Sequence, residues 1–185
     1  RQRQMCIRDR FTVEHPKLRI EIRTKCARTD LWKELPVCDR VIYAFTLSPE
    51  EITACYEHGT PTLAARVASV KLAGKMGHPV RLCFDPMIYY PHYKEVYRRM
   101  LGEVFAQIDT EHIVDVSMGS FRISKDYLKN MRRHDVLSPV VQFPYENIDG
   151  VYQYPDKLRQ EMEGFLHKEL CKYVEEEHIF CWDQI

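Results

Sequence analysis

Apolar and polar residues along the chain follow two periods, a period of two in short runs and a period near 3.6 in longer ones. Residues 18–25 alternate apolar Leu18, Ile20 and Ile22 with charged side chains, which is typical of a strand with one covered face. Short runs rich in β-branched and aromatic residues predict three further strands, at residues 40–46, 79–84 and 112–118.

Helical patterns separate these strands. They predict helices at residues 30–35, 49–57, 60–76 and 92–108. In the third, we expect Thr60 to be the N-cap, with Pro61 in the first turn and Gly77 after the end. Strands that alternate with helices form parallel crossover units, so the sequence predicts an α/β fold, either part of a parallel (β/α) barrel or a doubly wound sheet.

The last third of the chain departs from this alternation. Residues 136–143 predict a strand, and Asp149-Gly150 predicts the turn of an inserted β-hairpin. Pro155 opens a further helix, and residues 178–182 predict a final strand.

Charge and hydropathy narrow the class of protein. Lys and Arg total 27, and Asp and Glu also total 27, so no net basic field draws the whole molecule to nucleic acid. No run of 18 apolar residues is present, so we expect no membrane span and a cytoplasmic location. Basic residues gather at two places, each of which is either a solvated helix face or a phosphate-binding patch. They are the pair Arg98-Arg99 and the cluster Lys125, Lys129, Arg132, Arg133 and His134.

The cysteines and histidines do not form a recognisable metal or catalytic set. Seven cysteines occur without a CxxC pair, and we interpret Cys55, Cys83, Cys171 and Cys181 as buried thiols. We interpret the histidines at element ends as surface residues: His58, His78, His92 and His112.

The two ends of the chain differ from the rest. Residues 1–10 (RQRQMCIRDR) fit neither a signal peptide nor an amphipathic element and resemble a translated sequencing-adapter scar, so we assign the fold to residues 11–185. We also expect both ends to be truncated.

Polar residues at the carboxyl ends of the predicted strands are the candidate site. Lys25, Thr46, Ser48 and Asp85 fall where ligands bind in parallel sheets. Each also has a structural interpretation. Lys25 is otherwise an exposed lysine, Thr46 and Ser48 are helix caps, and Asp85 caps a turn or pairs with Arg66.

The order of motifs resembles the carboxyl half of the spore photoproduct lyase family of radical S-adenosylmethionine (SAM) proteins. The resemblance covers nearly all of residues 18–185. Its motifs are, in order, Thr24-Lys25, Phe45-Thr46-Leu47-Ser48-Pro49-Glu50, Glu57-x-Gly59-Thr60 with Arg66-Val67 and Gly77, Phe84-Asp85-Pro86-Met87-Ile88, Ser117-Met118-Gly119-Ser120-Phe121-Arg122 and Asp149-Gly150.

This resemblance implies a partial parallel (β/α) barrel of the radical SAM type, truncated here and carrying the inserted β-hairpin. It implies SAM and a [4Fe–4S] cluster as cofactors of the complete protein, and DNA containing a thymine dimer as its substrate. Lys25 and Thr46 resemble SAM contacts of the family, and Ser48 and Asp85 lie beside them. The hairpin tyrosines Tyr145, Tyr152 and Tyr154 would meet the damaged duplex.

One family motif is missing. The cluster-binding CxxxCxxC loop does not occur in these 185 residues, so we expect the chain alone to hold no cluster and to be inactive. Two alternatives remain open, namely a radical SAM protein with another substrate and a non-catalytic α/β module that binds nucleic acid or a partner through the hairpin.

Overall fold

The computed structural model describes residues 11–12 and 14–181, and a parallel sheet runs through its centre. Five strands form this sheet, in the order β1-β2-β3-β4-β8 with every neighbouring pair parallel. Their bounds are Ile20–Thr24 for β1, Val41–Thr46 for β2, Val80–Met87 for β3, Ile113–Ser120 for β4 and Ile179–Cys181 for β8. The sequence-predicted α/β class and its parallel strands are therefore confirmed. The predicted scar at residues 1–10 and Trp182 of the last strand lie outside the described residues.

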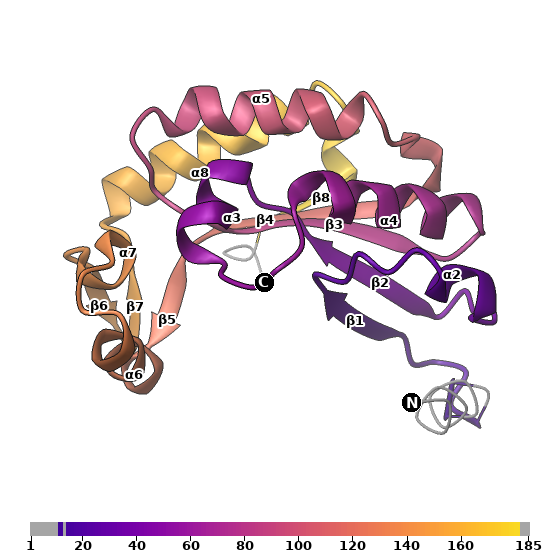
Figure 1. Ribbon diagram of the computed structural model, residues 1–185, viewed down its shortest axis with the longest axis horizontal. Coiled ribbons are helices and arrows are strands. Elements are labelled where there is room, and N and C mark those ends of the chain that lie inside the picture. The colour runs from indigo at the N-terminus through magenta and orange to yellow at the C-terminus, as the bar shows by residue number, and fades with distance from the viewer. Residues whose placement is uncertain (1–10, 13, 182–185) are drawn as a thin grey trace.

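Helices cover one face of this sheet. Figure 1 shows α3, α4, α5 and α8 on the same side of the strands. Their bounds are Glu50–Tyr56 for α3, Leu63–Lys75 for α4, Tyr93–Phe105 for α5 and Asp156–Leu170 for α8. The short helices are α2 (Leu31–Glu34) and two 3₁₀ turns, η1 (Thr110–His112) and η2 (Glu176–His178). Among the described helices, none is long and apolar enough to cross a bilayer.

The register gives the two faces of the sheet opposite chemistry. Phe45 pairs with Leu82 and Leu82 with Val116, and these buried side chains pack under the helices. One residue along, Arg23 pairs with Ala44, Ala44 with Arg81, and Arg81 with Asp115. Because successive side chains of a strand point to opposite faces, the charged row lies on the face away from the helices. An apolar core on one side thus supports a polar surface on the other.

A second, smaller sheet follows β4. Its strands β5 (Arg122–Ser124), β6 (Glu146–Ile148) and β7 (Val151–Gln153) pair antiparallel in the order β5-β7-β6. Figure 1 shows this sheet at one end of the molecule together with α6 (Lys125–His134) and α7 (Pro139–Gln142). The predicted hairpin is confirmed, because β6 and β7 are joined by Asp149 and Gly150, both with positive φ.

The backbone conformation of the hairpin turn leads to a first prediction. It compares a glycine at positive φ with a glycine inside a helix. Gly150 has a φ of +85°, where a side chain is strained, whereas Gly164 lies inside helix α8 with open space around it. We expect Gly150→Ala to lower the free energy of unfolding by about 1–2 kcal/mol. The control Gly164→Ala should raise it by about 0.5–1 kcal/mol. Urea denaturation of both variants measures this difference, and a stabilising Gly150→Ala would contradict the turn.

Two predictions about local structure are wrong. Residues 136–143 do not form a strand, because Pro139 opens the short helix α7 and Val136 and Leu137 are exposed. The N-cap of α4 is Thr62, whose Oγ1 accepts from the Ala65 N–H, and not Thr60. Thr60 is instead held by its own hydroxyl, which donates to the Glu57 carbonyl at 2.8 Å.

Some predictions of side-chain burial are also wrong. His78 is buried rather than exposed, and its Nε2 lies 3.1 Å from the Trp32 carbonyl. Cys83 is buried as expected, whereas Cys55 in α3 and Cys171, directly after α8, are exposed.

Candidate functional site

The predicted site residues lie at the carboxyl ends of three neighbouring strands. Lys25 follows the last residue of β1, Thr46 ends β2, and Asp85 lies near the end of β3. Thr24 pairs with Phe45 and Thr46 pairs with Cys83, so the strands end close to the same level. Because parallel strands present the same ends to the same side, these residues share one edge of the sheet.

Lys25 and Ser48 meet at a carboxylate that the sequence analysis did not single out. The Lys25 Nζ lies 2.9 Å from Glu57 Oε1, and the Ser48 hydroxyl donates to the same oxygen at 2.8 Å. On the other oxygen, the Arg66 Nη2 donates to Glu57 Oε2 at 2.6 Å. We call Lys25, Ser48, Glu57, Thr60 and Arg66 the Glu57 cluster.

Arg66 ties this cluster to the sheet. Its side chain is 0% exposed, and its remaining donors reach the Thr46 carbonyl at 3.2 Å, the Pro61 carbonyl at 2.9 Å and the Thr60 hydroxyl at 2.7 Å. The buried guanidinium therefore fixes the end of β2 and the loop before α4 in one arrangement. The predicted alternative, in which Asp85 pairs with Arg66, is wrong, because Arg66 pairs with Glu57.

The environment of Glu57 favours its charged form. Burial of the carboxylate opposes ionisation, but hydrogen bonds from Lys25, Arg66 and Ser48 outweigh it and lower the pKa of Glu57 below its ordinary value of 4.5. The charged carboxylate is thus maintained beside Lys25 at neutral pH.

This lowered pKa predicts a pH dependence. A group whose pKa is lower in the folded state stabilises the fold above its unfolded pKa, and that stability is lost as the pH falls through the folded pKa. We therefore expect Glu57→Gln to destabilise the protein near neutral pH, and the gap to wild type to shrink as the pH falls below the ordinary value of 4.5. Urea titrations across this range measure the gap. The exposed Glu103→Gln serves as control, and a gap that widens in acid would contradict the assignment.

Asp85 lies in a separate contact on the polar face. Its Oδ1 accepts from the Arg23 Nη1 at 2.7 Å and its Oδ2 accepts from the Ser117 hydroxyl at 3.1 Å. Burial raises the pKa of the neighbouring Cys83 thiol to about 12, so this cysteine stays protonated. Asp85 lies on β3 and thus links the neighbouring β4 to β1, which lies beyond β2.

Further charges continue across the same face. Arg81 binds Asp115 with both its Nε and its Nη2, the latter at 2.7 Å from Asp115 Oδ2, and also pairs with Glu21. Glu21 in turn lies 3.3 Å from the Arg23 Nε. The polar face therefore carries a connected set of ion pairs from β1 to β4, which holds these side chains in fixed positions.

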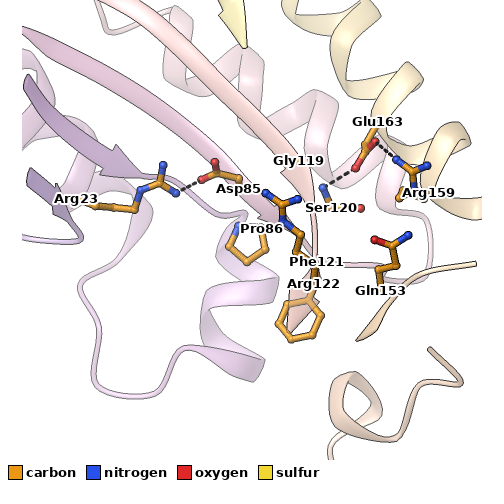
Figure 2. Close-up of a pocket in the computed structure, with 10 residues that line it drawn as sticks. All are labelled: Arg23, Asp85, Pro86, Gly119, Ser120, Phe121, Arg122, Gln153, Arg159 and Glu163. Atoms are coloured by element: carbon orange, nitrogen blue, oxygen red, sulfur yellow. Dashed lines mark hydrogen bonds and ion pairs between the residues drawn. The ribbon is translucent and has the colours of Figure 1, made fainter. Parts of the chain in front are cut away.

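A cavity of about 290 Å³ opens beside Asp85, between the end of β4 and the second sheet. Figure 2 shows the side chains around it, with an ion pair from Arg23 to Asp85 and contacts from Glu163 to Ser120 and Arg159. We call it the arginine cavity. It is lined by Arg23, Asp85, Pro86, Gly119, Ser120, Phe121, Arg122, Gln153, Arg159 and Glu163.

The predicted hairpin tyrosines differ in accessibility. Tyr154 is buried, its hydroxyl oxygen accepts from the Tyr89 N–H at 2.9 Å, and burial raises its pKa to about 12. Tyr145 is half-buried and donates to the Val140 carbonyl at 2.6 Å. Tyr152 is also half-buried, in β7. The rings of Tyr145 and Tyr154 lie 5.3 Å apart, so two of the three belong to an aromatic cluster beneath the hairpin. Their contact with DNA stays a prediction.

The described residues do not fit an iron–sulfur cluster. No group of three or more His, Cys, Asp or Glu side chains is close enough to hold a metal ion within the part of the chain that the structure describes. The protonated Cys83 beside Asp85 is also a poor ligand, because a metal binds the thiolate. Residues 11–12 and 14–181 therefore supply strand-end polar groups but no ligand set for a cluster.

Comparison with known proteins gives a match in structure. No protein-family model matches the chain. Among curated proteins, none matches its sequence. A doubly substituted spore photoproduct lyase with bound AdoMet and dinucleoside spore photoproduct superposes with a TM-score of 0.75 at 14% identity, over 88% of this chain and 50% of that chain. Spore photoproduct lyase complexed with dinucleoside spore photoproduct gives a TM-score of 0.73 at 15% identity, with the same coverage.

The chain has the fold of about half of spore photoproduct lyase. This confirms the predicted fold, a partial parallel barrel like that of spore photoproduct lyase, and the chain spans about half the length of the solved structures it matches. Structural similarity at 14–15% sequence identity shows the fold alone. The roles of Lys25, Thr46, Ser48 and Asp85 toward a cofactor therefore stay predictions.

Four residues at the site were not predicted from the sequence to be site residues. Glu57 was recognised only as a motif residue at a helix end, and Arg23, Arg122 and Arg159 were not singled out as ligand-binding residues. The alternation of residues 18–25 placed Arg23 on the polar face, which was a usable signal. Arg159 lies in a helix 74 residues beyond Asp85 in the chain, and nothing local in the sequence indicates that the two line the same cavity.

Proposed function

We propose that this chain is the SAM-binding and substrate-facing part of a radical SAM protein of the spore photoproduct lyase type, which repairs thymine dimers in DNA. The observation that carries this proposal is the pairing of that fold with polar strand ends, Lys25, Thr46, Ser48 and Asp85, on the sheet edge where parallel α/β proteins bind ligands.

In this proposal, each residue has a defined task. Lys25 binds the SAM carboxylate, because its ammonium group has three N–H donors and Glu57 takes one of them. Thr46 lies toward the ribose, with its carbonyl already fixed by Arg66. Glu57 holds the Lys25 ammonium group in place through their ion pair.

The proposed chemistry also needs an iron–sulfur cluster, for which the described residues supply no ligand set. The [4Fe–4S] cluster would supply the electron for SAM cleavage, and polypeptide outside these residues would carry its CxxxCxxC loop. The ion pairs of the polar face would hold the strand-end side chains of this chain in position. The inserted hairpin would face the DNA.

The upstream gene sequence tests this directly. We expect the complete reading frame to encode CxxxCxxC before Leu18, separated from it by roughly half a barrel. A reading frame without this motif would overturn the enzymatic proposal. The alternative would then be a non-catalytic α/β module that binds nucleic acid or a protein.

A further inference from the structure

The basic pair of helix α5 is neutralised by acids of neighbouring helices. Arg98 lies 3.4 Å from Glu169, and Arg99 pairs with Glu51. Of the two interpretations open to this pair from the sequence, a solvated helix face or a phosphate-binding patch, these partners favour the solvated face. The second group of basic residues lies in helix α6.

The basic residues of α6 have no such partners. Lys125, Lys129 and Arg133 are exposed, and within the described part of the chain no ion pair or side-chain hydrogen bond joins any of them to another residue. They recur at every fourth residue, so they lie along one side of the helix. We call these three residues the α6 stripe. Arg132 is left out of it, because its Nε donates to the Val141 carbonyl at 2.8 Å.

The charge of α6 is also unbalanced locally. The helix holds four Lys or Arg residues and one acid, Asp126, and Asp135 follows its last residue. Two positive charges are therefore in excess over residues 125–135, although acids and bases balance over the whole chain. At 1.5 Å per residue the α6 stripe covers about 12 Å. Double-stranded DNA carries a negative charge for about every 1.7 Å of its axis, so a stripe of this length faces several phosphates.

The α6 stripe begins beside the hairpin. The Lys125 N–H donates to the Gly150 carbonyl of the hairpin turn at 3.3 Å. Figure 1 shows α6 with the second sheet at one end of the molecule, apart from α4 and α5. Leu128 of α6 is buried against its own protein, and most of the exposed residues of the helix are polar. A helix that lies in a bilayer instead presents an apolar face outward.

We propose that the α6 stripe binds the phosphate backbone of duplex DNA next to the segment that the hairpin meets. The choice of DNA rests on the proposed function, whereas the preference for a polyanion rests on the unpaired cations and the local excess of positive charge. The contact is independent of base sequence and of damage, because phosphates position a protein on the duplex without reading it.

Fluorescence anisotropy of the 185-residue chain with a short duplex that carries no lesion tests this without SAM or a cluster. We expect the duplex to bind, with an affinity that falls as the salt concentration rises. The variant Lys125→Gln/Lys129→Gln/Arg133→Gln should bind at least about tenfold more weakly at low salt. Its plot of log affinity against log salt should be less steep by about 2–3, since each phosphate contact contributes about 0.9 to the slope.

A matched control removes the same number of charges elsewhere. Lys71→Gln/Lys75→Gln/Arg99→Gln changes exposed residues of α4 and α5, and it should leave the affinity within about twofold because distant exposed charges are screened. Circular dichroism confirms that each variant is folded. Lys129→Gln alone should reduce the slope by about one, which keeps the test decisive if the triple variant does not fold.

Five outcomes would overturn the proposal. They are no binding of the duplex, equal losses in the two triple variants, an affinity that does not respond to salt, and polyglutamate or phosphatidylserine vesicles bound as tightly as the duplex. A gene without CxxxCxxC would defeat the proposed enzyme and leave the duplex titration intact. A failed titration beside an intact motif would defeat the α6 stripe alone, so the two failures are distinguishable.

Discussion

Replacing Arg66 by methionine will destabilise the protein by about 3–5 kcal/mol, the cost of leaving a buried charge without its partner. Arg66 is 0% exposed and donates to Glu57, Thr60 and two backbone carbonyls. Methionine is similar in length and cannot donate, so the Thr46 and Pro61 carbonyls lose their arginine contacts. Glu57 keeps Lys25, Ser48 and a long hydrogen bond of 3.5 Å from the Thr60 hydroxyl.

Urea denaturation measures this loss. The matched control is Arg99→Met, which breaks an ion pair with Glu51 whose two side chains are 54% and 35% exposed and which should cost about 0–1 kcal/mol. The double variant Arg66→Met/Glu57→Gln should recover part of the loss, because it removes the uncompensated carboxylate. A loss in Arg66→Met no larger than in the control would show that the Glu57 cluster does not hold the strand ends.

The sequence predicted the strands of this molecule more completely than it predicted the site. The alternation at residues 18–25 predicted a strand with one covered face, and the apolar runs that follow it predicted three strands buried in a parallel sheet. The Asp149-Gly150 pair predicted the hairpin, because few residues other than glycine and asparagine or aspartate adopt positive φ at both turn positions. These are local effects, and local sequence carries them.

The errors arose where tertiary contacts overrode local preference. Thr60 and Thr62 flank Pro61 and both suit an N-cap, but the Arg66 guanidinium takes the Thr60 hydroxyl and leaves the cap to Thr62. Residues 136–143 contain strand-favouring valines, yet Pro139 begins a helical turn there. His78 was assigned to the surface by its place at an element end, whereas its ring packs against Trp32 and Tyr43.

The site itself was predicted in part. The strand-end rule placed Lys25, Thr46 and Asp85 at one edge, because parallel strands share their polarity. Sequence alone did not reveal that Glu57 is the group on which Lys25, Ser48 and Arg66 converge. Those partners come from 32 residues before Glu57 to 9 residues after it, and only folding brings them together.

The second large effect concerns Lys25, if it binds the SAM carboxylate as we propose. Lys25→Ala in the complete protein should then weaken SAM binding by about 1–3 kcal/mol, the scale of losing a hydrogen bond between charged groups. The same change should cost the fold little, because Lys25 is 36% exposed and Arg66 and Ser48 still hold Glu57. Affinity and stability should therefore respond differently.

Calorimetric titration of SAM into the complete protein, reconstituted with iron and sulfide under anaerobic conditions, tests the central claim most directly. Lys75→Ala, in the last turn of α4, removes the same charge from an exposed position and serves as control. We predict that the wild type and Lys75→Ala bind SAM equally, and that Lys25→Ala binds it about 5- to 150-fold more weakly. Equal affinities of all three proteins would contradict the account and leave Lys25 as an exposed lysine at the end of a strand.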